Sequence, residues 1–342
     1  MTRAHVISGS FGSGKTTAIR WLMANKPQSE LWIVVLNEFT EAGIDALTVA
    51  QSARGEYDVR LVAGGCLCCV GELEFGKQLR DILRNFKPAR LLVEPSGAGH
   101  AADIVDAMSE YQRQNALSLD SIICLVDSQD AIHLLHNRPP NEWSQIQSAD
   151  VLLLSKPDLA SAADRAAFAA IASAQYPSKL LLGESVHGEL PSASMQAFER
   201  APRFSLIELD AKDGGQASTT PITATFEISG RAGSESQLFQ LGHWAVQWML
   251  PSELVFARVT LEPRIHWLLE TYQGWLRRMK AVFRTGRGPS WLVQSHGRGM
   301  STEDSAYRRD SRLEIVLTAE PTQDFLNHWR QLLRDAAQSN VD

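Results

Sequence analysis

The chain has 342 residues, of which 44% are hydrophobic and 21% are charged, enough for about two domains with hydrophobic cores. This composition excludes an intrinsically disordered chain and a small disulfide-stapled one. Lys and Arg number 33 against 39 Asp and Glu, which gives a net charge of −6 without a long basic run, so neither nucleic acid nor an anionic membrane is expected as the main partner.

Short apolar runs alternate with longer amphipathic segments through the first half of the chain. Strands are predicted at His5–Ser8, Leu31–Leu36, Arg90–Glu94, Ile122–Asp127, Val151–Ser155 and Lys179–Leu182. Helices are predicted at Lys15–Ala24, Glu72–Phe86 and Ala160–Ala174. Continuous apolar strands that alternate with helices are typical of an α/β fold whose mostly parallel sheet is buried on both faces.

This alternation stops near residue 183, and residues 211–221 have the composition of a linker. We therefore expect a first domain over residues 1–185, a linker over 186–220 and a C-terminal domain over 221–342. In the last part we predict an amphipathic helix at Trp267–Met279 and strands at Ile222–Ile228, Lys280–Arg284, Ser290–Gln294 and Arg312–Leu317. These elements indicate a smaller α+β domain.

Residues 9–16 read Gly-Ser-Phe-Gly-Ser-Gly-Lys-Thr and match the phosphate-loop pattern G-x-x-x-x-G-K-[ST] between the first predicted strand and the first predicted helix. Glycines let the backbone fold around a phosphate group, so that N–H groups and the helix N-terminus face the anion. Lys15 would reach the β and γ phosphates, and the Thr16 hydroxyl is a ligand for Mg²⁺. The first domain is therefore predicted to be a P-loop NTPase domain.

Two further strands end in polar residues that such a site needs. Glu94 follows an apolar run and is either a Mg²⁺ ligand, directly or through water, or a helix cap. The run Leu152–Leu154 leads into Ser155-Lys156-Pro157-Asp158, which resembles the base-reading element [NT]-K-x-D. An aspartate accepts two hydrogen bonds from guanine N1–H and N2–H₂, a pair that adenine lacks, so Asp158 favours GTP over ATP.

Three of the four cysteines lie in the segment Cys66-Leu67-Cys68-Cys69. Thiols so close together are soft ligands for Zn²⁺, Co²⁺ or Cu⁺, with a redox pair as the competing interpretation. The loop after the second predicted strand holds Glu38, Glu41 and Asp45. Glu38 or Glu41 would complete a thiolate site, and Asp45 would position Mg²⁺ or water. Cys124 lies within an apolar run and is expected to be an inert buried residue.

Taken in order, the phosphate loop, N-E-F-x-E-x-G-I-D, G-G-C-x-C-C, E-x-S-G, Q-I-x-x-A-D and S-K-x-D make the chain resemble the CobW-like metallochaperone GTPases, relatives of the GTPases that deliver nickel to urease and hydrogenase. The motifs cover residues 4–160. The resemblance implies a GTPase that binds a transition metal, with zinc or cobalt as cargo, and passes it to a client metalloprotein. Nucleotide state, GTP or GDP, would control the metal site.

The resemblance also implies residue roles. Phosphate binding falls on Gly12, Ser13, Gly14, Lys15, Thr16 and Thr17, with Thr16 on Mg²⁺. Catalytic roles fall on Lys15, Thr16, Asp45 and Glu94, and base recognition on Ser155, Lys156 and Asp158. The transition-metal ligands would be Cys66, Cys68, Cys69, Glu38 and Glu41. The chain departs from the family pattern at Thr40, Pro95 and Ser155, and it lacks a His-rich tract near the domain junction.

No run approaches the ~18 apolar residues of a membrane span, and the first residues lack the features of a signal peptide, so a cytoplasmic protein without a membrane partner is expected. The favoured function is slow, Mg²⁺-dependent GTP hydrolysis by a metallochaperone. Two alternatives stay open at this point: a nucleotide-gated interaction module whose cysteine loop is redox-active or vestigial, and a P-loop kinase that uses ATP.

Overall fold

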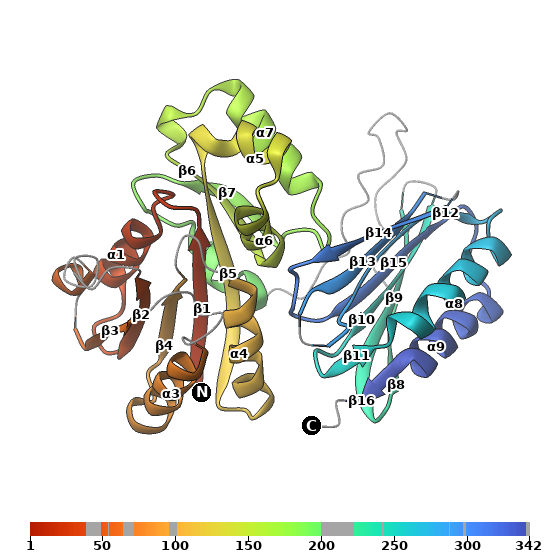
Figure 1. Ribbon diagram of the computed structural model, residues 1–342, viewed down its shortest axis with the longest axis horizontal. Coiled ribbons are helices and arrows are strands. Elements are labelled where there is room, and N and C mark those ends of the chain that lie inside the picture. The colour runs from red at the N-terminus through yellow and green to blue at the C-terminus, as the bar shows by residue number, and fades with distance from the viewer. Residues whose placement is uncertain are drawn as a thin grey trace. The chain divides into compact units, whose positions relative to one another are not determined.

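The computed structural model describes residues 1–38, 49–53, 55–63, 72–95, 101–199, 222–240, 243–286, 288–296 and 299–339. The chain divides into two compact units, Met1–Arg203 and Phe204–Asp342 (Figure 1). Among the described residues, no helix has both the length and the apolar character that a membrane crossing requires.

Unit 1 is built on a seven-stranded parallel sheet in the order β3-β2-β4-β1-β5-β6-β7. Its strands are β1 (Thr2–Gly9), β2 (Trp32–Glu38), β3 (Tyr57–Ala63), β4 (Arg90–Glu94), β5 (Leu117–Asp127), β6 (Val151–Ser155) and β7 (Leu181–Ser185). Its helices are α1 (Lys15–Asn25), α3 (Glu72–Asp81), α4 (Ala101–Arg113), α5 (Ala131–Asn137), α6 (Pro140–Ser148) and α7 (Ala162–Ser173). Shorter helical turns are η2 (Ile82–Phe86), η3 (Ser128–Asp130), η4 (Pro157–Leu159) and η5 (Ser192–Glu199).

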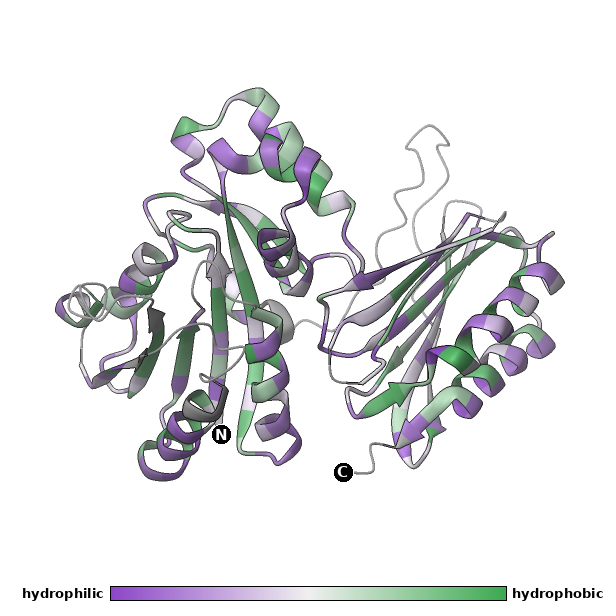
Figure 2. Ribbon diagram, in the orientation of Figure 1, coloured by the Kyte–Doolittle hydropathy of each residue, from purple (hydrophilic) through white to green (hydrophobic). Residues whose placement is uncertain are grey.

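The sheet of unit 1 is buried on both faces, which is why its strands read as continuous apolar runs. Helices α3, α4, α5, α6 and α7 contribute to the core on one face, and α1 and η5 to the core on the other. Figure 2 shows hydrophobic residues along β5, in the middle of this sheet. The predicted α/β fold with a mostly parallel sheet is confirmed.

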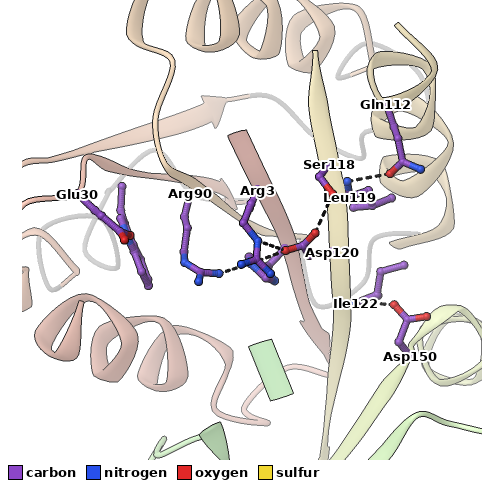
Figure 3. A network of polar contacts seen from close by, with 11 residues as sticks. Arg3, Glu30, Arg90, Gln112, Ser118, Leu119, Asp120, Ile122 and Asp150 are labelled. Atoms are coloured by element: carbon purple, nitrogen blue, oxygen red, sulfur yellow. Dashed lines mark hydrogen bonds and ion pairs between the residues drawn. The ribbon is translucent and has the colours of Figure 1, made fainter. Parts of the chain in front are cut away.

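A β-bulge interrupts the pairing of β5 with β1, where the register shifts between residues 4 and 6 of β1. The N–H groups of Leu119 and Ile122 flank the bulge and donate to side chains (Figure 3). Leu119 donates to Gln112 of α4 over 2.8 Å, and Ile122 donates to the buried Asp150 over 2.9 Å. Asp150 is the last residue of the Q-I-x-x-A-D motif, so this aspartate satisfies a backbone group of the sheet.

Asp120, which lies in the bulge, is buried and takes part in a polar network with residues of β1 (Figure 3). Asp120 accepts a short hydrogen bond from Arg3, and His5 lies beside the same carboxylate. His5 Nε2 is 2.9 Å from a guanidinium nitrogen of Arg90. Arg90 also lies over the ring of Trp32.

Unit 2 carries an antiparallel sheet in the order β14-β13-β12-β15-β10-β9-β8, with a short pair formed by β11 and β16. Its strands are β8 (Ile222–Ile228), β9 (Arg231–Gln240), β10 (His243–Leu250), β11 (Leu254–Phe256), β12 (Leu276–Phe283), β13 (Ser290–Ser295), β14 (Met300–Ser305), β15 (Ser311–Leu317) and β16 (Ala337–Ser339). The helices α8 (Arg258–Thr271) and α9 (Gln323–Ala336) lie side by side on one face (Figure 1).

The core of unit 2 lies between these helices and the sheet, with Trp248, Trp291 and Trp329 fully buried. Hydrophobic and hydrophilic residues mix along α8 and α9 (Figure 2), as one buried and one exposed face require. The hairpin between β8 and β9 turns through Ser229 and Gly230, both at positive φ, which matches the twist of the flanking strands. The predicted α+β character of this domain is confirmed.

The helix predicted at Trp267–Met279 is wrong in its bounds. The helix α8 ends at Thr271, and Leu276 already belongs to β12. A β-bulge between Leu276 and Arg278 separates the core residues Leu276 and Met279 by three positions, which is the spacing of a helix face. The bulge therefore mimics helical periodicity in a strand.

The bounds predicted for the linker and the two domains stay a prediction. Leu190 and Met195, which follow β7, are buried in the core of unit 1. The division between the two units falls between Arg203 and Phe204. Most of the predicted linker, residues 200–220, lies outside the described residues.

Candidate functional site

The loop between β1 and α1 has the backbone that phosphate binding requires. Gly12 and Gly14 adopt φ values of 76° and 92°, which only glycine adopts without strain. Gly14 directly precedes α1, so the helix begins with Lys15 and Thr16. The N-terminus of α1 therefore lies at this loop, where an anion is stabilised by the helix dipole.

Thr16 and Glu94 meet at the edge of the sheet although 78 residues separate them. The Thr16 hydroxyl donates to the Glu94 carboxylate over 3.0 Å. Both side chains offer hard oxygen atoms, which are the ligands that Mg²⁺ prefers, so the residues present fit this ion. Lys15 Nζ donates to the backbone carbonyl of Ser10 over 2.9 Å and stays within the loop.

The side chain of Gln145 forms a hydrogen bond with the backbone of the phosphate loop. This buried residue of α6 accepts a 2.7 Å hydrogen bond from the N–H group of Gly9, the first glycine of the loop. Gly9 has φ 141°, and a side chain there would lie 2.4 Å from the carbonyl oxygen of Leu125. Ser13 is fully buried, whereas Thr17 is exposed. The role of Gln145 was missed in the sequence, although it begins the Q-I-x-x-A-D motif, because nothing local links it to residue 9.

The predicted base-reading element follows the next strands of the same sheet edge. Ser155 ends β6 and donates to the carbonyl oxygen of Val126 over 3.3 Å. Lys156 follows with φ 52° and forms an ion pair of 2.6 Å with Asp127, the last residue of β5. Asp158 is exposed on η4. Carboxyl ends of parallel strands form the ligand-binding edge of such sheets.

The predicted transition-metal site falls largely on residues outside the described part of the chain, which are Glu41, Cys66, Cys68 and Cys69. Asp45, predicted to position Mg²⁺ or water, also lies outside the described residues. Glu38 ends β2, so its backbone stands two strands away from the phosphate loop in the sheet order. Within the described residues, no group of three or more His, Cys, Asp or Glu side chains is arranged to hold a metal ion. The cysteine and acidic-loop roles remain predictions.

Cys124, by contrast, is described and behaves as expected. It is buried on β5, and this burial raises the pKa of its thiol to about 11. The thiol is therefore protonated at neutral pH and is neither a good nucleophile nor a metal ligand.

A parallel sheet with a phosphate loop after its first strand and a carboxylate beside the loop threonine defines a P-loop nucleotide-binding domain. Residues 3–180 match the family model for the CobW/HypB/UreG nucleotide-binding domain, more than half of the chain. The protein therefore belongs to the CobW/HypB/UreG family, and the resemblance inferred from its motifs is confirmed.

The chain is 29% identical over 334 residues to the zinc chaperone YeiR of Escherichia coli strain K12, an alignment that covers 94% of each chain. It is 24% identical over 161 residues to the zinc-regulated GTPase metalloprotein activator 1 of Schizosaccharomyces pombe, covering 46% of this chain and 39% of that one. Among solved structures, the Zn(II)-bound YjiA GTPase from E. coli is 16% identical with a TM-score of 0.43, covering 97% and 98% of the two chains.

Proposed function

We propose that the protein is a Mg²⁺-dependent GTPase that binds zinc and passes it to a client metalloprotein in the cytoplasm. The observation that carries the nucleotide half of this proposal is the meeting of Thr16 and Glu94 at the phosphate loop, next to the strand ends that bear Lys156 and Asp158. The zinc half is supported by the similarity to the zinc chaperone YeiR over almost the whole chain.

Phosphoryl transfer needs positioning and charge neutralisation more than covalent chemistry. The N–H groups at the start of α1 would bind the phosphate oxygens, and Lys15 would turn from the Ser10 carbonyl to the β and γ phosphates. Thr16 and Glu94 would hold Mg²⁺, which neutralises charge on these phosphates when bound. No arginine finger or water-orienting glutamine is assigned, so we expect slow intrinsic hydrolysis.

Guanine rather than adenine is the proposed base. The Asp158 carboxylate, exposed at the end of the sheet, accepts the two donors that guanine presents at N1 and N2. Adenine presents no such pair, so an ATP-dependent kinase would leave Asp158 without a role. Competition between GDP and ADP for the protein separates these two functions.

Zinc is proposed to bind the thiolates of Cys66, Cys68 and Cys69, with Glu38 or Glu41 completing the site, and cobalt is the second candidate cargo. Cysteine side chains bind metal as deprotonated thiolates, and the affinity depends on how these thiolates are arranged around the metal. The segment with Glu41 and Asp45 follows β2 in the sequence. If this segment responds to the γ phosphate, zinc will bind with different affinities in the presence of GTP and of GDP. By linkage, zinc will then change nucleotide affinity by the same factor.

The test is the zinc dissociation constant of the reduced protein with GTP·Mg²⁺, with GDP·Mg²⁺ and without nucleotide, measured by chelator competition. A several-fold difference between nucleotide states is expected. A variant with Cys66, Cys68 and Cys69 changed to Ser should lose tight zinc binding but still bind GDP. The matched control is Cys124→Ser, because the buried Cys124 thiol stays protonated and should not contribute.

Lys15→Ala should abolish the nucleotide effect and GTP hydrolysis while zinc still binds. Equal hydrolysis rates for the wild type and Lys15→Ala would refute the GTPase assignment. Zinc affinity that ignores nucleotide would refute the coupling and favour a nucleotide-gated interaction module whose cysteine loop has another purpose.

A further inference from the structure

We infer that Asp127 is a positioning residue of the nucleotide site, which holds the Lys156 side chain where its stem lies against the nucleotide base. This inference rests on the proposed function, because it assigns a residue to the base-reading part of that site. Asp127 belongs to none of the motifs that pointed to nucleotide binding in the sequence.

The parallel pairing of β5 with β6 brings Asp127 and Lys156 together. Asp127 and Ser155 are register partners at the carboxyl ends of these two strands, and Lys156 is the next residue along. Lys156 Nζ lies 2.6 Å from Asp127 Oδ2. The Asp127 side chain is only 9% exposed, whereas 41% of the Lys156 side chain remains accessible. A fixed, buried carboxylate therefore anchors the ammonium group of a lysine whose side chain is still partly accessible to solvent.

The carboxylate of Asp127 is itself held in place. Its second oxygen, Oδ1, accepts from the N–H group of Gln129 over 3.1 Å and caps the turn η3. Each Asp127 oxygen thus has its own partner, which determines the direction of the bond to Lys156. An ammonium group bonded to a preorganised carboxylate loses much of the rotamer freedom that a lysine otherwise keeps.

The backbone of Lys156 is held from the same strand end. Ser128, the neighbour of Asp127, is fully buried and donates from its hydroxyl to the Lys156 carbonyl oxygen over 2.9 Å. The same carbonyl accepts from the N–H group of Leu159 over 3.0 Å and so closes the turn that bears Asp158. The end of β5 therefore fixes both the side chain of Lys156 and the turn that presents Asp158.

The physical consequence is preorganisation. If the Lys156 side chain had to become ordered when the base binds, the loss of its rotamer entropy would lower nucleotide affinity. A side chain that Asp127 already holds in place avoids this cost. Loss of the Asp127 charge should therefore weaken the binding of nucleotides through their base and leave contacts at the phosphate loop intact.

The experiment measures affinities of the full-length protein for GDP, ADP and inorganic pyrophosphate, each with Mg²⁺, by calorimetry. Asp127→Asn keeps the side-chain volume and an oxygen for the Gln129 N–H but removes the charge that pairs with Lys156. Lys156→Met keeps the stem but removes the ammonium group. The matched control is Asp130→Asn, which removes the same charge from an exposed residue of η3.

We expect Asp127→Asn and Lys156→Met each to weaken GDP binding by about 3- to 12-fold, the range expected when one rotamer-rich side chain must be ordered on binding. The GDP affinity of the double variant should lie within about twofold of the weaker single variant, because both changes break the same interaction. The pyrophosphate affinity of each variant should match that of the wild type within about twofold. The GDP affinity of the control Asp130→Asn should do the same.

Three results would overturn the inference. The first is a GDP affinity of Asp127→Asn equal to that of the wild type, and the second is a loss of GDP affinity in the double variant equal to the product of the two single losses. The third is a loss of pyrophosphate affinity as large as the loss of GDP affinity, which would mean general damage to the fold. If Asp127→Asn does not fold, Lys156→Met tests the same pair alone, and GDP affinity equal to the wild type refutes the inference. The wild-type affinities separate this inference from the proposed function. If the wild type binds ADP as tightly as GDP, guanine recognition is refuted. The comparison of the single and double variants still tests the role of Asp127, because it can be made with either nucleotide.

Discussion

Gln145 illustrates how single residues position the phosphate loop in this protein. Its side-chain oxygen accepts from Gly9 N–H in a fully buried position, and α6 is held in turn by Lys179, whose ammonium donates to three carbonyl groups near the end of that helix. A motif residue whose role the sequence left open thus links α6 to the phosphate loop.

At the residue scale, Gln145→Leu should lower the free energy of unfolding by about 1–3 kcal/mol, because the Gly9 N–H then stays buried without an acceptor. GDP·Mg²⁺ affinity should fall as well, since Gly9 begins the phosphate loop. Urea denaturation and calorimetry measure the two effects. The exposed Gln114→Leu serves as control and should change neither quantity. Unchanged nucleotide affinity in Gln145→Leu would restrict Gln145 to a role in stability.

At the scale of elements, the ion pair of Arg60 with Asp81 joins β3 to α3, the two elements on either side of the segment with the clustered cysteines. Hydrogen bonds from Arg60 and then from Asn85 hold the pKa of Asp81 below its ordinary value. Arg60 also lies over the ring of Phe86 in η2, so a charged and an aromatic contact converge on one guanidinium group.

The lowered pKa of Asp81 predicts an acid-dependent loss of stability. The unfolded chain binds this proton more readily than the folded one, so the pair stabilises the fold above the ordinary aspartate pKa of about 3.9 and this contribution disappears as the pH falls further. The free energy of unfolding of Asp81→Asn should therefore be lower than that of the wild type at pH 6, and the difference should shrink towards pH 3. Urea titrations across this range, with Asp130→Asn as control, measure it. A difference that stays constant with pH would contradict the assignment.

At the scale of the whole molecule, each unit has its own core, and unit 2 adds a buried ion pair to its core. Glu235 of β9 is 1% exposed and receives two hydrogen bonds from Arg330 of α9, at 2.7 and 2.8 Å. The indole N–H of Trp248 on β10 donates to the same carboxylate over 2.8 Å. One carboxylate therefore ties two strands of the sheet to the helix that covers them.

Glu235→Ala should lower the free energy of unfolding of unit 2 by about 3 kcal/mol, because it removes the carboxylate that accepts from the buried indole N–H of Trp248 and from the partly buried Arg330. Since unit 1 has a separate core, GDP·Mg²⁺ affinity should remain that of the wild type. Thermal unfolding with and without GDP, together with calorimetry, checks both statements. Glu235→Gln, which keeps the shape and one acceptor, should be less destabilising. A Glu235→Ala variant that is folded but cannot bind GDP would contradict the independence of the nucleotide site.

The α/β class of unit 1 and the phosphate loop could both be predicted from the amino-acid sequence. Each depends on a local pattern: buried parallel strands are continuously apolar, and phosphate binding needs glycines, a lysine and a threonine at fixed spacing. Because carboxyl ends of parallel strands share one edge, the sequence also places Glu94 on the same edge as the phosphate loop, but it leaves a Mg²⁺ ligand and a helix cap as alternatives for this residue.

The contacts between residues that are far apart in the chain follow from the folded structure alone. Gln145 lies 136 residues from Gly9, and Asp127 lies 29 residues from Lys156, so no short-range pattern connects either pair. The bulge in β12 likewise gave a strand the spacing of a helix, and only pairing with β15 distinguishes the two. Sequence periodicity reports which side of an element is buried, whereas partners across a sheet depend on strand order and register, which are properties of the folded chain.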